Sequence, residues 1–261
     1  MPFVNVGDAR LHWKLEGAST APVLVLLNSI GTDMDLWDPV LPFLRDRFRL
    51  LRIDARGHGA SSAPTGDYTL VSLANDVAGV MEAAGVERAG IAGVSLGGMI
   101  AMQLALDAPA RVAGLALICT SATMDRSAWT DRVALVRDAG LASIADLVMG
   151  RFLSPDFAAE RMEISEAVRR KLLAMAPEGY AGCGAAIRDM ELADRLGAIA
   201  CPTLVVTGDR DTSTPLVGHG DHLLAAIEGA RHVRLAAAHL APLEAPEALA
   251  VALTEHFTNR N

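Results

Sequence analysis

The chain has 261 residues, of which 51% are apolar, and this supply suffices for one large hydrophobic core. A net charge of -8 at neutral pH provides no basic surface for nucleic acid. Mean hydropathy is +0.30, yet no stretch approaches the roughly 18 uninterrupted apolar residues of a membrane-spanning helix. We therefore expect a single domain over residues 1–261 that binds neither nucleic acid nor a membrane.

The N-terminus and the cysteines indicate a cytoplasmic protein. Residues 1–16 alternate apolar and polar side chains, which predicts a β-hairpin and differs from the basic start and apolar middle of a signal peptide. The cysteines Cys119, Cys183 and Cys201 are odd in number and contain no close pair, which disfavours disulfides and a zinc site. We expect a reducing compartment, no metal and no cofactor.

Continuous apolar runs, typical of strands buried on both faces of a parallel sheet, recur along the chain. They cover residues 23–27, 48–53, 90–94, 112–119 and 203–207, and a last, partly exposed strand is predicted at residues 231–235. Between the second and third runs, apolar residues recur at helical spacing, with Thr69 as a plausible N-cap and Gly85 as a plausible stop. This alternation predicts an α/β fold, with a mostly parallel sheet and helices on both faces.

The alternation stops between about residues 122 and 197, where the patterns are helical or irregular. Ile164, Val168, Leu172 and Met175 form an apolar stripe there, and we expect most of them to pack into the core. Because strands on both sides of this insertion are needed to complete one core, we predict a helical cap over the sheet rather than a second domain.

The sequence G-V-S-L-G at residues 93–97 has the pattern G-x-S-x-G of a nucleophile elbow. A predicted strand precedes it and an apolar helix through about Ala108 follows it, as the elbow requires. Glycines allow the strand and the helix to approach at so sharp a turn. We predict that Ser95 is a nucleophile at the carboxyl edge of the sheet. The alternative interpretation is an ordinary glycine-rich turn with an N-cap serine.

A serine nucleophile needs a base to take its proton, and that base needs an acceptor to orient it. Two aspartates follow the run at residues 203–207. Asp209 lies beside Arg210 at the strand end, and we interpret it as a turn or ion-pair residue. Asp211 is further along the loop, where it can reach the site. We favour Asp211. The other usual position, after residues 112–119, has no carboxylate until Asp125.

One of the seven histidines completes the chain order serine, aspartate, histidine. His239 follows the last predicted strand and precedes a final helix that ends near Phe257. Position assigns the others to the hairpin, to loops, to a partly exposed strand end or to the C-terminus: His12, His58, His219, His222, His232 and His256. We predict that His239 is the general base.

Two backbone N–H groups are expected to bind the oxyanion of the tetrahedral intermediate. One is that of Leu96, directly after the nucleophile. The other belongs to the loop after residues 23–27, where Ile30 is the best candidate.

Several motifs together carry a family resemblance. They are N-S-I-G-T-D at residues 28–33, Trp37-Asp38, R-I-D-A-R-G-H-G at residues 52–59, Trp129, Arg132, and P-E-G-Y-A at residues 177–181. With them the chain resembles the α/β-hydrolase superfamily over essentially its whole length, and within it the 3-oxoadipate enol-lactonases. One departure is L-A-P-L-E at residues 240–244, where that family usually has I-S-N-I-E.

The resemblance implies an α/β-hydrolase fold and a triad of Ser95, Asp211 and His239. It also implies hydrolysis of 3-oxoadipate enol-lactone to 3-oxoadipate, a step of the β-ketoadipate pathway in aromatic catabolism. The enolate is a good leaving group, and ketonisation of the released enol opposes ring closure.

The implied substrate carries a free carboxylate, for which a chain of charge -8 needs a local cation. Candidates in the insertion are Arg132 and Arg151, with Trp37, Trp129 and Tyr180 as pocket walls. The alternative for each arginine is a solvated side chain or a surface ion pair.

The same triad serves other chemistry, so competing functions stay open. A cofactor-free perhydrolase or a general carboxylesterase would use the same three residues. A hydrolase-fold receptor for a small molecule would keep them with little turnover. Haloalkane dehalogenases and epoxide hydrolases have an aspartate at the elbow, so Ser95 disfavours both. The sequence carries no pattern that sets the oligomeric state.

Overall fold

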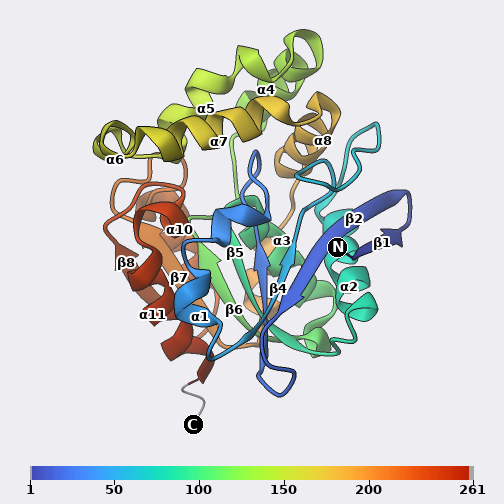
Figure 1. The fold of residues 1–261 in the computed structure, drawn as a ribbon, viewed down its shortest axis with the longest axis vertical. Helices are drawn as coiled ribbons and strands as arrows, with labels where there is room; N and C mark the ends of the chain where they lie inside the picture. Colours follow the sequence, from blue (N-terminus) through green and yellow to red (C-terminus); the bar gives the residue numbers. More distant parts are fainter. Residues whose placement is uncertain (1, 259–261) are drawn as a thin grey trace.

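The computed structural model describes residues 2–258. Within them, eight strands form one sheet in the order β1-β2-β4-β3-β5-β6-β7-β8 (Figure 1). The N-terminal hairpin of β1 (Phe3–Val6) and β2 (Ala9–Glu16) pairs antiparallel, and β2 also pairs antiparallel with β4 (Arg49–Ile53). All other neighbours are parallel. The predicted α/β-hydrolase fold with a mostly parallel sheet is confirmed.

The parallel strands lie where the sequence predicts strands. They are β3 (Val23–Leu27), β5 (Ala89–Val94), β6 (Val112–Ile118), β7 (Thr203–Gly208) and β8 (Arg231–Leu235). Every residue of β5 and β7 is buried, because helices cover both faces of the sheet.

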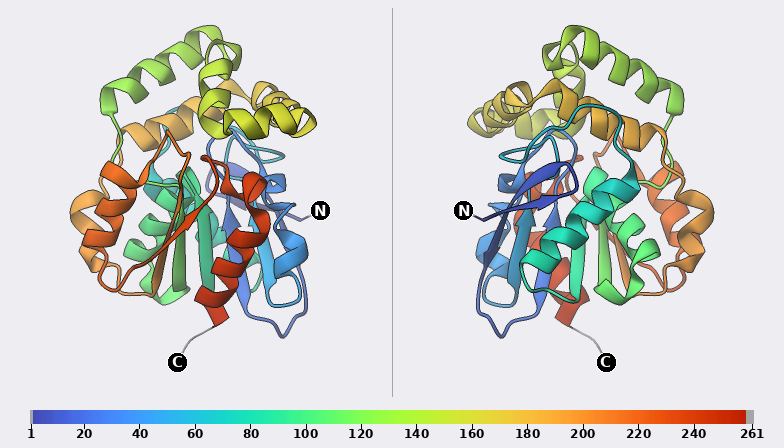
Figure 2. Two further views of the ribbon diagram at one scale, coloured as in Figure 1. Left: turned by 90° about the vertical axis from the view of Figure 1, so that its left-hand side faces the viewer. Right: turned by 90° about the vertical axis from the view of Figure 1, so that its right-hand side faces the viewer.

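Helices pack on each side of the sheet (Figure 2). On one face, α2 (Leu70–Ala83) packs against α3 (Leu96–Asp107). On the other face, α1 (Leu41–Leu44) packs against α11 (Pro246–Thr258). Thr69 begins α2 with a capping box, as its sequence predicts.

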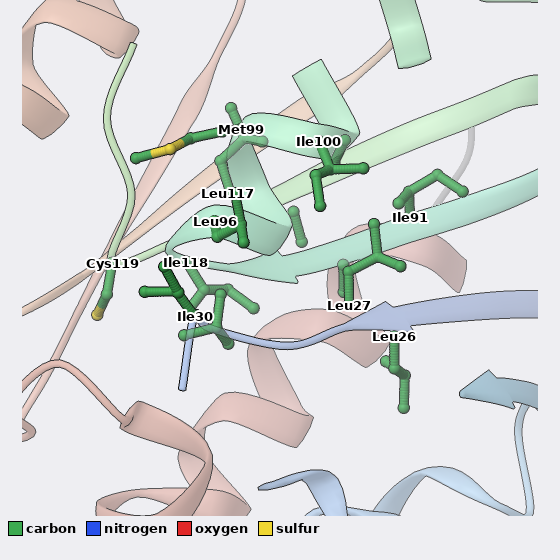
Figure 3. Packing of buried hydrophobic residues seen from close by; sticks show 14 of the residues in the cluster. Leu26, Leu27, Ile30, Ile91, Leu96, Met99, Ile100, Leu117, Ile118 and Cys119 are labelled. Carbon is green, nitrogen blue, oxygen red and sulfur yellow. The ribbon is translucent and has the colours of Figure 1, made fainter. Parts of the chain in front are cut away.

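The core lies between these layers. Figure 3 shows Leu27 of β3, Ile91 of β5 and Ile118 of β6 packed near Leu96 and Ile100 at the start of α3. All five side chains are at most 4% exposed. Burial of each side chain stabilises the fold by about 1.5 to 3 kcal/mol. This packing therefore stabilises the segment where β5 turns into α3.

Five helices lie beyond the carboxyl ends of the parallel strands, and we call them the cap (Figure 1). They are α4 (Arg126–Ala139), α5 (Ala145–Phe152), α6 (Pro155–Glu160), α7 (Met162–Ala174) and α8 (Pro177–Arg188). None of the helices in residues 2–258 is long and apolar enough to cross a membrane.

The expectation that most of the apolar stripe at residues 164–175 packs into the core is confirmed. Leu172 is fully buried, and Val168 and Met175 are partly buried and pack against the core. Ile164 is also partly buried, and together with Val168 it lines a surface groove of about 190 Å³. Helix α7 packs against α5 and α6 and leaves part of its apolar face open to solvent.

Candidate active site

Ser95 lies at the sharp turn between β5 and α3. Its φ of 55° and ψ of -117° are strained for a residue with a side chain, at a cost of about 1 to 3 kcal/mol. The glycines of the motif are required sterically, since a Cβ on Gly93 would lie 2.2 Å from the carbonyl oxygen of Gly97. A Cβ on Gly97 would lie 2.5 Å from the carbonyl oxygen of Leu27. Hydrogen bonds from Ser95 N to Ile118 O (2.9 Å) and from Thr120 Oγ1 to Ser95 O (2.6 Å) hold the turn.

Asp211 and His239 come together from the loops after β7 and β8. Nδ1 of His239 lies 3.0 and 3.1 Å from the two carboxylate oxygens of Asp211. The carboxylate also accepts hydrogen bonds from Ser213 N (2.8 Å) and from Thr214 N and Oγ1 (3.2 and 2.8 Å). Asp209 points elsewhere and pairs with Arg210.

The electrostatics keep Asp211 ionised. Burial alone would raise its pKa, but the charge of His239, its hydrogen bond and those from Ser213 and Thr214 lower the pKa to about 2. An ionised Asp211 accepts a hydrogen bond from the Nδ1–H of His239, which leaves Nε2 as the basic nitrogen.

Ser95 and His239 line the same cavity. No hydrogen bond joins Ser95 Oγ to the imidazole in the part of the chain that the structure describes. Catalytic hydrogen bonds are often long until substrate binds, so we expect contact to form in the complex. The Phe152 ring from the cap stacks on His239 at 6.2 Å between centroids. It restricts the imidazole to orientations near this one.

The two predicted oxyanion donors share an unusual property. Ile30 and Leu96 are both buried, yet within residues 2–258 neither backbone N–H donates a hydrogen bond. Buried N–H groups are almost always paired because an unpaired one is costly. Two such groups near Ser95 are what an oxyanion site requires.

The cavity contains charge of one sign. Among residues 2–258, the charged side chains that line it are Arg132 and Arg151 from the cap, with Trp129 and Tyr180 beside them. The Arg132 guanidinium lies 4.4 Å from the centre of the Trp129 ring. Burial and the nearby charge of Arg132 lower the pKa of Arg151. Neither arginine forms an ion pair with a carboxylate of the described residues.

Trp37 and His58 lie in surroundings that differ from those the sequence predicts. Trp37 does not line the cavity, because its short 3-10 helix (Met34–Trp37) turns the ring into the hydrophobic core, where it is fully buried. His58 is not a plain loop residue, since it is buried and its Nε2 accepts the Gly31 N–H at 3.0 Å, next to Ile30. The signal available for His58 was a histidine between two glycines in R-G-H-G, which does not identify its partner.

The cavity is small and has a larger neighbour. Its volume is about 30 Å³, enough for two or three waters. Met124 and Ile187 form a wall that it shares with a cleft of about 600 Å³. A substrate larger than a few atoms therefore requires this wall or the cap to move.

Comparisons with known proteins agree with this fold. The family model described as the alpha/beta hydrolase fold matches residues 22–174. The chain is 32% identical to 3-oxoadipate enol-lactonase 2 of Acinetobacter baylyi over 242 residues, which are 92% of this chain and 90% of that protein.

Two solved structures are similar over nearly the whole chain. An enol-lactonase from Burkholderia xenovorans LB400 superposes with a TM-score of 0.96 at 33% identity, covering 99% of this chain and 100% of the other. A hydrolase from Pseudomonas aeruginosa PA01 has a TM-score of 0.95 at 41% identity and 98% coverage of both chains. The chain belongs to the α/β-hydrolase family, and it resembles the enol-lactonases within it.

Proposed function

We propose that this α/β-hydrolase, which acts on ester bonds, is a serine hydrolase of lactones or esters that carry a carboxylate. The candidate substrate is 3-oxoadipate enol-lactone. The observation that carries the proposal is a cavity that joins Ser95 and His239 to Arg132 and Arg151 and that has no carboxylate among its lining residues.

The proposed reaction begins with attack of Ser95 Oγ on the lactone carbonyl while Nε2 of His239 takes the hydroxyl proton. Asp211 stabilises the imidazolium that forms, and the N–H groups of Ile30 and Leu96 bind the oxyanion. In a serine protease of another fold, one such donor lowers the barrier by about 3 to 4 kcal/mol. The tetrahedral intermediate collapses, the ring C–O bond breaks, and His239 returns the proton to the enolate oxygen. Water activated by His239 then hydrolyses the acyl-enzyme.

The two arginines supply the affinity for the substrate carboxylate. They lie close enough for the charge of Arg132 to lower the pKa of Arg151, so an anion between them relieves a repulsion. Two other cap arginines already have carboxylate partners, since Arg126 pairs with Asp189 and Arg169 pairs with Asp146. An anion in this cavity therefore meets cations that have no competing carboxylate.

The likeness to named enol-lactonases supports this choice of substrate and, with it, a place in cytoplasmic aromatic catabolism. We also propose that the cap, within residues 122–197, and the sheet act as one domain. The support is that the cavity takes Arg132, Arg151 and Tyr180 from the cap, and Ser95 and His239 from the sheet edge.

The test is hydrolysis by the purified protein of 3-oxoadipate enol-lactone, a neutral five-membered lactone and p-nitrophenyl acetate. We expect the highest kcat/KM for the carboxylated enol-lactone. A preference for the neutral esters would contradict the proposal and would indicate a general carboxylesterase. Peroxide-dependent turnover of acetate as the main activity would indicate a perhydrolase, and absence of turnover on every substrate would favour a receptor.

A further inference from the structure

His58 is a buried histidine that the proposed reaction does not use. It lies in the loop after β4, is 1% exposed and does not line the catalytic cavity. We propose that His58 is a positioning residue whose Nε2 holds the peptide between Ile30 and Gly31 and so aims the Ile30 N–H at the oxyanion. This inference rests on the proposed function.

The hydrogen bonds of His58 allow one protonation state. The Gly31 N–H can only donate, so Nε2, at 3.0 Å from it, must be the acceptor. The carbonyl oxygen of Arg56 can only accept, so Nδ1, at 3.1 Å from it, must carry the hydrogen. The ring is therefore neutral with its proton on Nδ1. Burial also lowers the pKa of His58, in agreement with a neutral ring.

The oxyanion loop depends on this contact. Between Ser29 and Thr32 the chain makes a turn closed by bonds from Thr32 N and Oγ1 to Ser29 O, at 3.2 and 2.9 Å. Among the described residues, the bond from Gly31 to His58 is the one hydrogen bond that ties residues 29–32 to another part of the chain. Gly31 also has a φ of 82°, a conformation that places no restraint of its own on a glycine.

Close packing on both flanks keeps the imidazole in place. A Cβ on Gly57 would lie 2.3 Å from the Cα of Gly179 in α8, so the loop touches the cap backbone directly. A Cβ on Gly59 would lie 2.3 Å from the carboxyl group of Asp54. That carboxylate accepts the Ala60 N–H at 3.0 Å and the Met34 N–H at 2.8 Å, which fixes the segments after His58 and after the oxyanion loop.

Removal of the acceptor leaves the Gly31 N–H buried and unpaired. The loop then shifts until this group finds a partner, and the Ile30 N–H moves with it. Loss of a whole oxyanion donor costs about 100- to 1,000-fold in kcat in a serine protease, so a displaced donor should cost roughly 10- to 100-fold.

The test compares His58→Leu, His58→Gln and His256→Leu with the wild-type protein. Leu removes the acceptor, whereas the amide oxygen of Gln can replace Nε2. His256 is the matched control, a buried histidine of α11 whose Nδ1 lies 3.3 Å from a guanidinium nitrogen of Arg231, in a helix that packs against α1, α10 (Ala241–Glu244), β6 and β8. The readouts are kcat and KM for p-nitrophenyl acetate, the inhibition constant of a trifluoromethyl ketone that forms a tetrahedral oxyanion, and Tm.

We expect His58→Leu to lower kcat and the affinity for the ketone by the same factor, with KM within about twofold. His58→Gln should recover most of the loss, and His256→Leu should lower Tm while keeping kcat. Unchanged kcat and ketone affinity in folded His58→Leu would overturn the proposal, as would a loss that follows Tm in all three variants.

Two further outcomes are also decisive. If His58→Leu does not fold, His58→Gln is compared with His58→Asn, whose shorter side chain does not reach Gly31, and equal activity of these two overturns the proposal. Wild-type protein that hydrolyses no ester overturns the proposed function itself, and this inference with it.

Discussion

The two unpaired arginines of the cavity give a sharp prediction about substrate selection. We consider Arg132→Met and Arg151→Met, singly and together, because methionine keeps an unbranched apolar stem of similar reach and removes the charge. Each arginine is expected to make a charge-assisted hydrogen bond to the substrate carboxylate, and such bonds are worth about 1.5 to 3 kcal/mol.

The expected size of the effect follows from this energy. At 1.36 kcal/mol per factor of ten, each single substitution should lower kcat/KM for the carboxylated lactone by roughly 10- to 150-fold. A cavity of about 30 Å³ leaves little water to screen the charges, so the upper part of this range is expected. The kcat/KM for p-nitrophenyl acetate should change less than threefold, since this ester carries no carboxylate for the arginines to bind.

The assay is steady-state hydrolysis of both substrates by each variant. Arg169→Met serves as the matched control, because this cap arginine is partly exposed and pairs with Asp146 outside the cavity. Equal losses on the charged and neutral substrates would refute the reasoning. So would a loss of the same size in Arg169→Met.

Three other predictions follow from the site. The lowered pKa of Asp211 stabilises the fold above its ordinary pKa of 3.8, and this contribution is lost as pH falls toward about 2. The difference in the free energy of unfolding between wild type and Asp211→Asn, measured by denaturant unfolding, should therefore decrease from pH 4 to pH 2. A difference that stays constant over this range would contradict the prediction. Glu244 accepts hydrogen bonds from Ser154 N (2.6 Å) and Oγ (2.9 Å) in the cap and from Ala238 N (3.2 Å) beside His239. Glu244→Gln should lower Tm by several degrees and also kcat, whereas a fall in Tm alone would show that the link does not position His239. Met124→Ala should join the cavity to the neighbouring cleft and raise kcat/KM for p-nitrophenyl octanoate relative to acetate, and Met190→Ala, which lines only the cleft, should not.

Features set by neighbours along the chain were predictable from sequence. The strands follow continuous apolar runs, and Thr69 and Gly85 bound α2 because caps and stops act within one turn. The pattern around Ser95 implies its own backbone geometry, since a Cβ at Gly93 would collide with the backbone of Gly97 and Gly98 on the opposite side of the turn. Short-range chemistry of this kind depends little on the remainder of the fold.

Features set by distant contacts were not predictable in the same way. Trp37 was assigned to the pocket by resemblance, but the turn that carries it faces the core. The partner of His58 is 27 positions earlier in the chain, and nothing in R-G-H-G specifies it. The stripe of α7 has helical spacing, yet the spacing does not tell whether Ile164 faces the core or a groove.

The proposed function depends most on Ser95 as the nucleophile. The direct measurement is intact-protein and peptide mass spectrometry after reaction with a fluorophosphonate, alongside hydrolysis of the enol-lactone by wild type and Ser95→Ala. We predict one adduct, on Ser95, and loss of nearly all turnover in Ser95→Ala. The Tm of this variant should be at least that of wild type, because the substitution leaves the packing around the turn intact. An adduct on another residue, or substantial turnover by Ser95→Ala, would contradict the account.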